Sequence, residues 1–423
     1  MGLNIHTLRR AYRTTAVISF NTFVAVVVVN LLLWAVFSFR DAPVSTRVDI
    51  PPAPVTASGL FREDGTAVDN GKRTASNLTI FDFKSFEGVM SEPEIAALLD
   101  EYYVHHRQHG FSYQPFTQYG HRTFDGKYLN VHRLDNGLTV RRTINPPTAE
   151  TDVQPIRIFA FGGSTTFGSG LADSQTWPSQ LSHILNARAR EIGLGVPIEV
   201  VNYGRVGFYP TQELYLLMDV LRSGARPQMA IFLDGVNFGR VDDTPNLTTD
   251  YHRIVDKAQL GGVQALDALP MMRAVNYFTR APGSVLPPAR YEVDHLVTRF
   301  LQFKETATLI AEHHGIEALF ILQPDGHYNY PAHRYSTGRQ VNSEASRALK
   351  AAFYDAFPED HGFVDMTGLF EKWGDRKALM DAAHYSPNFA RFVAQEIAAL
   401  VDLETLKQRR RPDAAPTGTP RRQ

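Results

Sequence analysis

The sequence predicts an α/β protein built as a three-layer αβα sandwich around a mainly parallel sheet of about five strands. From residue 155 onward, short apolar runs alternate with segments of helical periodicity, which is typical of a parallel sheet covered by helices on both faces. The runs end in polar or permissive residues, which therefore collect at the sheet edge where such folds bind ligands. The expected strands are IRIFAFG, IEVVNYG, MAIFLDG, IEALFILQP and a weaker GFVDMT, and the expected helices cover residues 176–190, 210–224, 291–314, 342–357 and 386–404.

An apolar segment near the N-terminus predicts one membrane-spanning helix. Residues 14–39 carry no charge, and at about 1.5 Å of rise per residue they can cross a hydrocarbon core of roughly 30 Å. Arg9, Arg10 and Arg13 precede this segment. We therefore expect the N-terminus to stay in the cytoplasm and the rest to be exported, as a single-pass protein of the inner (cytoplasmic) membrane with a periplasmic domain. A cleaved signal peptide is the alternative, but its apolar region normally spans only about 7–15 residues.

Two segments are expected between the anchor and the sheet. Residues 40–75 are rich in proline and small residues, which indicates an extended linker. Residues 76–150 form a small α+β lead-in, with a helix in SEPEIAALLDEYYVHH capped by Ser91 and a hairpin in KYLNVHRLDNGLTVRRT that turns at Asn136 and Gly137.

The remaining boundaries follow from composition. The strand–helix alternation defines one domain, which a long polar and proline-bearing insertion interrupts; such excursions often act as a lid or wall. The basic, proline-rich C-terminus predicts a disordered tail. The expected parts are 1–13 cytoplasmic, 14–39 transmembrane, 40–75 linker, 76–150 lead-in, 151–405 catalytic domain with its insertion at 238–290, and 406–423 tail.

Charge and cysteine content exclude several classes of function. Of 423 residues, 43% are hydrophobic, which is enough for a sizeable core. Lys and Arg number 43 against 44 Asp and Glu, so no global field favours nucleic acid. The chain has no cysteine, which excludes disulfides, thiolate metal sites and a cysteine nucleophile. His105, His106 and His109 have a spacing that can bind metal, but without a nearby carboxylate we expect a solvated helix face and no metal.

Ser164, in the stretch RIFAFGGSTTFGSG, has three competing interpretations. A phosphate loop needs GxxxxGK[ST], and here Ser169 stands where the lysine should be. A nucleophile elbow needs GxSxG, and here Thr166 replaces the second glycine. The third interpretation is that Ser164 caps a short helix or the helix near Thr176. The serine alone favours the cap.

Three distant segments favour a nucleophile instead. In DAAHYSPNF, Asp381 and His384 are spaced to present an acid and a base to one pocket, which a serine nucleophile needs. Glycines in VVNYGRVG and the amide of Asn237 in LDGVN could donate hydrogen bonds to an oxyanion. Each segment follows an expected strand or precedes the last helix, so all of them can meet at one edge of the sheet.

These blocks resemble the SGNH (GDSL-like) hydrolase family, of the membrane-anchored bacterial type, over about residues 155–403. FAFGGSTTFG is similar to the first block, with Ser164 as nucleophile, and VNYGRVG to the second, where Gly207 fits the oxyanion glycine better than Gly204. DGVNF is similar to the third block through Asn237, and DAAHYSP to the fourth through its Asp and His. The sequence departs from the family where Gly163 and Phe238 replace the usual aspartates, which bears on subfamily and substrate more than on catalysis.

The resemblance implies an SGNH/flavodoxin-like fold and a carboxylic-ester hydrolase without metal or cofactor. Its expected substrates are acyl groups, such as acetyl, on carbohydrate or cell-envelope glycans. Ser164, His384 and Asp381 would form the triad, with Ser164, Gly207 and Asn237 as the oxyanion hole. Two alternatives stay open: an O-acyltransferase with the same triad, and a polysaccharide-binding relative without turnover. Gln323 and His327, after the fourth expected strand, are candidate substrate contacts.

Overall fold

The computed structural model describes residues 5–40, 81, 83–109, 111–146, 153–237, 293–330, 344–381 and 383–409. The chain divides into two compact units, Met1–Pro51 with Thr249–Arg290 and Pro52–Thr248 with Tyr291–Gln423. The predicted linker at 40–75 beyond its first residue, the insertion at 238–290 and the tail from residue 410 onward lie outside the described residues.

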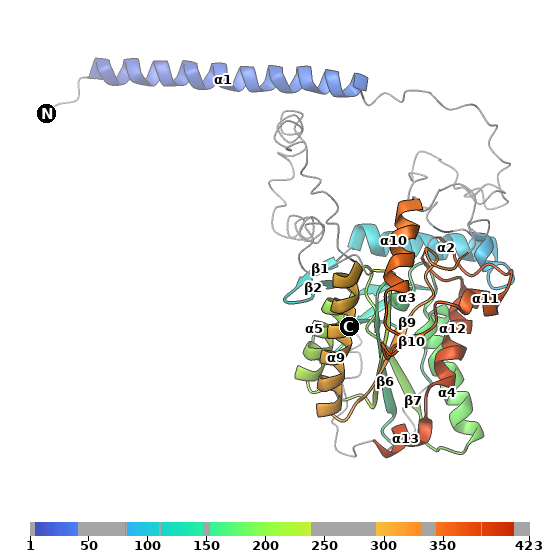
Figure 1. Ribbon diagram of the computed structural model, residues 1–423. Helices are drawn as coiled ribbons and strands as arrows, with labels where there is room; N and C mark the ends of the chain where they lie inside the picture. Colours follow the sequence, from blue (N-terminus) through green and yellow to red (C-terminus); the bar gives the residue numbers. More distant parts are fainter. Residues whose placement is uncertain are drawn as a thin grey trace. The chain divides into compact units, whose positions relative to one another are not determined.

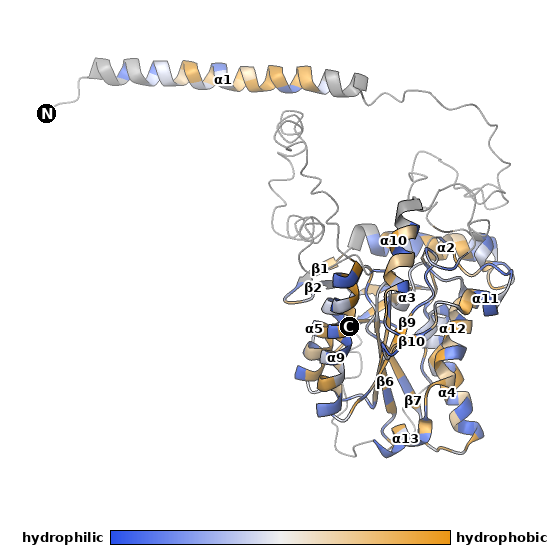
Figure 2. Cartoon of the chain, in the orientation of Figure 1, coloured by the Kyte–Doolittle hydropathy of each residue, from blue (hydrophilic) through white to orange (hydrophobic). Residues whose placement is uncertain are grey.

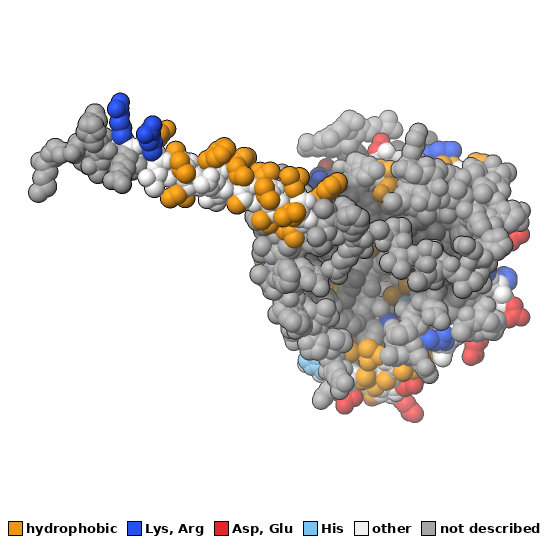
Figure 3. All heavy atoms as spheres, turned by 90° about the horizontal axis from the view of Figure 1, so that it is seen from above, with side chains coloured by type: hydrophobic (Ala, Val, Ile, Leu, Met, Phe, Trp, Pro, Cys, Tyr) orange, Lys and Arg blue, Asp and Glu red, His pale blue; other side chains and the backbone are white. Residues whose placement is uncertain are grey.

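The described part of the first unit is one helix, α1, which spans Ile5–Arg40. Its segment Tyr12–Trp34 has a mean hydropathy of 2.3 and is not buried. Figure 2 shows the apolar character of this helix, and Figure 3 shows basic side chains toward one end of it. By length and composition α1 can cross a membrane, as the sequence predicts, but a signal sequence near an N-terminus passes the same test. Its orientation stays a prediction.

The second unit contains five parallel strands, all of which the sequence predicts. In space their order is β10-β9-β8-β6-β7, the doubly wound order in which the chain leaves the first strand to one side and then to the other. The crevice beyond the carboxyl ends of the first and third strands is where such folds bind ligands. The strands are β6 (Ile156–Gly162), β7 (Ile198–Asn202), β8 (Met229–Asp234), β9 (Glu317–Leu322) and β10 (Val364–Asp365).

Helices cover both faces of this sheet and make it the middle layer of three (Figure 1). α4 (Trp177–Glu191) and α12 (Pro387–Ala399) pack on one face, and α5 (Pro210–Arg222) and α9 (Val293–His313) on the other. Every residue of β6 is buried, as expected for a strand covered on both sides. The chain also forms α10 (Glu344–Asp355), α11 (Leu369–Trp373) and α13 (Leu403–Gln408).

The sheet is larger than the sequence predicts: it has eight strands instead of about five. The three additional strands come from the lead-in and are antiparallel, and β5 pairs with β7 through Arg141 and Asn202. The predicted hairpin is confirmed, with Gly137 in the left-handed region at φ 84°. Without this hairpin, β7 would be an edge strand with unpaired N–H and C=O groups, so the lead-in completes the sheet. The added strands are β3 (Phe124–Asp125), β4 (Asn130–Arg133) and β5 (Thr139–Arg141).

The rest of the lead-in packs beside the sheet. The predicted helix is α2 (Glu92–Tyr103), and the Ser91 N–H before it donates to Glu94 Oε2 at 3.0 Å. A separate hairpin pairs β1 (Phe111–Gln114) with β2 (Gln118–His121). The prediction of a solvated histidine face is wrong for His105, which is 1% exposed and stacks on Phe167. The local pattern could not reveal that burial, because the ring it contacts lies 62 residues further along the chain.

A buried ion pair joins the lead-in to the loop after α3 (Ser164–Phe167). Arg141 Nε lies 2.8 Å from Asp173 Oδ1, and the two side chains are 0% and 7% exposed. Asp173 also accepts hydrogen bonds from the backbone N–H and the side-chain amide of Asn130, at 3.1 and 2.7 Å. The carboxylate is therefore well satisfied, and its loss would leave a buried guanidinium without a counter-charge.

We predict that Asp173→Ala lowers the free energy of unfolding of the second unit by about 3–5 kcal/mol, because it leaves Arg141 charged and buried. Urea unfolding of the full-length chain at neutral pH, followed by tryptophan fluorescence, measures this loss. The control is Asp219→Ala, which breaks a pair with Arg222 that is 78% exposed on the arginine side and should cost under about 1 kcal/mol. Equal losses in the two variants would contradict the prediction.

Candidate active site

The turn after β6 places Ser164 at the carboxyl edge of the sheet. Gly163 precedes α3, and Ser164 is the first residue of that helix, 8% exposed. Its carbonyl accepts a hydrogen bond from the Gly168 N–H at 3.0 Å, but its side chain caps no helix in the described part of the chain. Thr176 caps α4 instead, by accepting a hydrogen bond from the Ser179 N–H. The interpretation of Ser164 as a helix cap is therefore wrong, and its hydroxyl is left for another role.

Asn237 lies against the residue that precedes Ser164. A Cβ atom on Gly163 would stand 2.5 Å from Asn237 Nδ2, so a side chain does not fit there. Asn237 Nδ2 also donates to the Phe208 carbonyl at 2.7 Å. The contact explains why residue 163 is a glycine: the space that a side chain would need holds the amide. The predicted oxyanion donor and the predicted nucleophile are thus brought together.

The loop after β7 carries the two candidate oxyanion glycines, and they differ in role. The Gly204 N–H donates to Asn202 Oδ1 at 2.9 Å, and a Cβ atom on Gly204 would stand 2.4 Å from the backbone nitrogen of Phe167. Gly204 therefore allows the loop to pack closely on α3 and cannot donate to a substrate. Gly207 is buried in the left-handed region at φ 80°. These facts favour Gly207 over Gly204, as predicted, while its role as donor stays a prediction.

Asp381 and His384 form the expected acid–base pair. His384 Nδ1 lies 2.7 Å from Asp381 Oδ2, and the N–H groups of Ala383 and His384 donate to Asp381 Oδ1 at 2.8 and 2.7 Å. Burial acts to raise the pKa of Asp381, but the charge of His384 and these hydrogen bonds outweigh it and lower the pKa below its ordinary value. Asp381 therefore stays ionised, and it fixes the imidazole so that Nε2 is the nitrogen available for proton transfer.

His384 Nε2 is buried and has no hydrogen-bond partner among the described residues. No hydrogen bond joins it to Ser164 Oγ, which is common before substrate binds. Gln323 links their neighbours instead: its Oε1 accepts from Thr165 Oγ1 at 2.6 Å and from the Tyr385 hydroxyl at 3.2 Å. The residue after Ser164 and the residue after His384 thus meet on one amide oxygen. Gln323 is only 2% exposed, so its first role is to hold the two loops together.

His327, the other candidate substrate contact, belongs to a second Asp–His pair at the same edge. Its Nδ1 lies 2.8 Å from Asp325 Oδ1, and Lys350 Nζ lies 2.6 Å from Asp325 Oδ2. Burial acts to raise the pKa of Asp325, but Lys350 and His327 together lower it well below its ordinary value. The sequence analysis did not identify Asp325 and Lys350 as site residues. Asp325 lies two residues before His327, in the same segment after the fourth expected strand.

Lys350 also braces the turn that carries Asn237. Its Nζ donates to the carbonyls of Gly235 and Val236 at 2.9 and 2.7 Å. The lysine is 4% exposed, and the charge of Asp325 compensates its burial. The buried Lys350–Asp325 ion pair therefore holds the turn that carries Asn237, through the carbonyls of the two residues that precede it.

Two further carboxyl groups are buried near this turn. Glu213 on α5 and Asp234 at the end of β8 are 0% and 3% exposed, and both Glu213 oxygens lack hydrogen-bond partners in the described part of the chain. Burial raises the pKa of Asp234 to about 7, and burial together with Asp234 raises that of Glu213 well above its ordinary value. The pair holds protons in the folded state that the unfolded chain would release.

We predict that, between about pH 5 and 7, the free energy of unfolding has a more negative slope against pH in the wild type than in Asp234→Asn. The raised pKa means that the native chain binds a proton in this range and the unfolded chain does not, so stability is lost as that proton dissociates. One such proton changes the slope by about 1.4 kcal/mol per pH unit. Urea unfolding at several pH values measures it. Equal slopes in the variant and the wild type would refute this role of Asp234.

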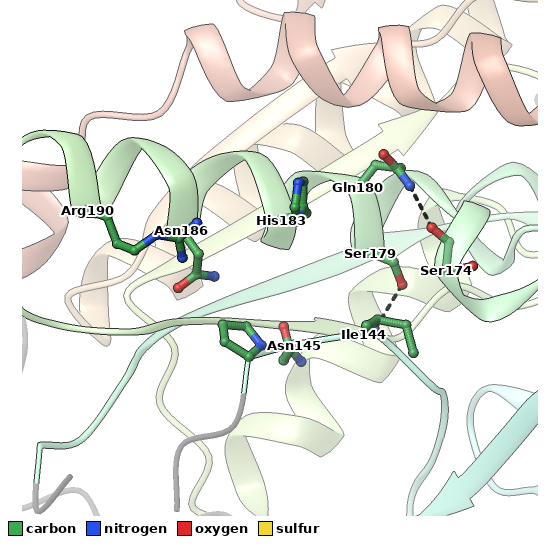
Figure 4. Close-up of a pocket in the computed structure, with 9 residues that line it drawn as sticks. Ile144, Asn145, Ser174, Ser179, Gln180, His183, Asn186 and Arg190 are labelled. Carbon is green, nitrogen blue, oxygen red and sulfur yellow. Dashed lines mark hydrogen bonds between the residues drawn. The ribbon is translucent and has the colours of Figure 1, made fainter. Parts of the chain in front are cut away.

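A pocket of about 280 Å³ lies away from these residues, against α4 (Figure 4). None of the predicted site residues lines it. Many of its polar groups are already used within the protein: Ser179 accepts from the Ile144 N–H, and Gln180 donates to the Ser174 carbonyl. We assign no role to this pocket. In the described ranges, no group of three or more His, Asp or Glu side chains is arranged to hold a metal ion.

Comparison with known proteins adds only a likeness to solved structures. No family model matches the chain, and no curated protein matches it. Many of the similar solved structures are named as esterases or lipolytic proteins of the G-D-S-L family. The acetyl xylan esterase AlAXEase is 14% identical, with 58% of this chain and 100% of that chain covered and a TM-score of 0.33. A member of the lipolytic protein G-D-S-L family from Veillonella parvula DSM 2008 is 12% identical, with coverages of 58% and 96% and a TM-score of 0.33.

A third example is the psychrotrophic esterase EstA from Pseudoalteromonas sp., which is 13% identical, with coverages of 58% and 95% and a TM-score of 0.29. Scores and identities this low carry no argument about activity. The strand order and the contacts around Ser164 are observed in the structure itself and do not depend on these similarities.

Proposed function

We propose that the chain is a membrane-tethered, exported serine esterase that removes acyl groups, such as acetyl, from carbohydrate or cell-envelope glycans. One observation carries the proposal: the Asp381–His384 pair presents a buried Nε2 that has no partner in the described part of the chain, in a loop tied through Gln323 to the turn of Ser164. A nucleophile, a base and an orienting acid in this arrangement define acyl transfer through a serine.

The proposed reaction has two halves. His384 Nε2 takes the proton of Ser164 Oγ as that oxygen bonds to the ester carbonyl carbon, and the carbonyl oxygen becomes an oxyanion. The N–H groups of Ser164 and Gly207 and the amide of Asn237 stabilise that charge. The bond to the alcohol then breaks, and the alcohol leaves with the proton from His384. Water next gives a proton to His384 and attacks the acyl carbon, and Ser164 regains its proton as the acid departs.

The features of α1 support the proposed tether and location. Its apolar segment is long enough to span a membrane, and the arginines before it favour a cytoplasmic N-terminus with the catalytic unit outside. A location on the outer side of the cytoplasmic membrane would bring the site to exported and envelope glycans. No cofactor is needed for this chemistry.

We predict that Ser164→Ala abolishes hydrolysis of short-chain aryl esters without unfolding the protein, since the hydroxyl caps no helix among the described residues. The expected loss in kcat is at least about 10³-fold, because the remaining groups cannot form the acyl-enzyme. A serine-reactive phosphonate should label the full-length wild type in detergent and should not label the variant. Thr166→Ala is a matched control in the same helix, and it should remain labelled. An active Ser164→Ala variant would refute the proposal.

An O-acyltransferase is the second candidate, and the Asp325–His327 pair favours it. A second imidazole held by a buried carboxylate at the same sheet edge could orient the hydroxyl of an acceptor sugar in place of water. We predict that, if the transferase is correct, the purified chain moves acyl groups from an aryl ester to added oligosaccharide faster than it hydrolyses the ester. Mass spectrometry of the oligosaccharide measures the transfer, and His327→Ala should lower transfer more than hydrolysis.

A binding protein without turnover is the third possibility that the sequence leaves open. Such a protein would be inert both to aryl esters and to the phosphonate. The complete set of catalytic residue types argues against it.

A further inference from the structure

The loop that carries Gly207 is clamped by the β1–β2 hairpin of the lead-in. The Tyr119 hydroxyl donates to the Val206 carbonyl at 2.9 Å, and the Val206 N–H donates to His121 Nε2 at 3.1 Å. Arg205 Nη1 donates to the Tyr119 carbonyl at 3.0 Å. The peptide groups on both sides of Val206 are therefore held by side chains that lie more than 80 residues earlier in the chain.

The bond from Tyr119 acts on the very peptide unit that contains the Gly207 N–H. The Val206 carbonyl and the Gly207 N–H belong to one planar trans unit, in which the two groups point in opposite directions. Fixing the direction of the oxygen therefore fixes the direction of the N–H. A hydrogen bond to the carbonyl also polarises that N–H and strengthens it as a donor.

Gly207 needs such a restraint. It lies in the left-handed region at φ 80°, and a glycine samples more backbone conformations than any other residue. A donor that stabilises an oxyanion contributes most when its direction is set before the reaction. Because a glycine has no side chain to restrain it, contacts made by the adjacent peptide groups contribute to that direction.

The Tyr119 side chain is itself rigidly placed. It is 6% exposed, and its ring contacts Phe111 and Phe208 at centroid distances of 5.0 and 5.3 Å. On the other side of the clamp, the His121 ring stacks on Phe167 of α3 at 4.1 Å, which connects the hairpin to the helix that begins with Ser164. The hairpin therefore holds the donor loop relative to the nucleophile turn.

We infer that Tyr119 is a positioning residue for the oxyanion hole: through the Val206 carbonyl it orients the Gly207 N–H toward the developing charge. The inference rests on the proposed function. It assigns a catalytic purpose to a segment that precedes the blocks resembling the hydrolase family. Its competitor is a purely structural role, in which the hydroxyl merely stabilises the lead-in.

The test compares Tyr119→Phe with Thr139→Val in the full-length chain. The first variant removes only the hydroxyl that binds the Val206 carbonyl. The second removes a buried hydroxyl that donates to the His121 carbonyl at 2.8 Å, so it loses the same kind of bond in the same hairpin without touching the Val206–Gly207 peptide. Ester hydrolysis, thermal unfolding and inhibition by an alkyl boronic acid, which forms a tetrahedral anion on the serine, are measured for each.

We expect Tyr119→Phe to lower kcat about tenfold with KM changed less than about twofold, because an oriented donor acts chiefly in the transition state. Boronate binding should weaken by a similar factor, while Thr139→Val keeps wild-type kcat and boronate affinity at a comparable change in melting temperature. His121→Phe, which removes the acceptor for the Val206 N–H, should also lower kcat, and His121→Gln should restore part of it.

Two results would overturn the inference while leaving the proposed function intact. In the first, Tyr119→Phe retains wild-type kcat and boronate affinity. In the second, both variants lose kcat in proportion to their loss of stability, which is the outcome of a structural role. A wild-type chain that neither hydrolyses esters nor reacts with the phosphonate would instead refute the proposed function, and the inference with it.

Discussion

The position of β6 between β7 and β8 is the constraint on which the rest of the second unit depends. β6 pairs in parallel with both neighbours, so the segments that follow all three strands emerge at one edge of the sheet. The turn of Ser164 is therefore flanked by the loop of Gly207 on one side and by the turn of Asn237 on the other. Since every residue of β6 is buried between helices, a shift of register would disrupt packing on both faces. The core thus fixes which loops can meet.

Strand order brings the loops together but does not fix the direction of their donors. Both flanking segments contain glycine, and short glycine-containing turns have many conformations available. In each case a buried side chain from elsewhere restrains the backbone: Lys350 binds the carbonyls before Asn237, and Tyr119 binds the carbonyl before Gly207. Gln323 does the same between the nucleophile turn and the His384 loop. These hydrogen bonds join the loops across the sheet edge.

The parts that the sequence could predict are those with a local signature. The longer parallel strands are short, mainly apolar runs, the hairpin turn is Asn136-Gly137, and Asp381 lies three residues from His384. The hydrogen bonds by which Lys350, Tyr119 and Gln323 join the loops at the sheet edge have no such local signature. Tyr119 and Val206 are 87 residues apart, and the sequence pattern around neither residue indicates that the two are in contact. For the same reason the sequence could not reveal that β5 pairs with β7 or that His105 is buried, because only the closed fold creates the surfaces that cover them.

The absence of a side chain at residue 163 lets Asn237 lie against the turn of Ser164. A side chain at Gly163 would collide with Asn237 Nδ2, so glycine lets the amide approach the nucleophile turn directly. The amide is then held by the Phe208 carbonyl, on the loop that the lead-in hairpin clamps. The Phe208 carbonyl, Lys350 and Tyr119 therefore each tie a loop at this edge of the sheet. The lead-in that supplies one of these ties is, on this argument, a component of the catalytic unit.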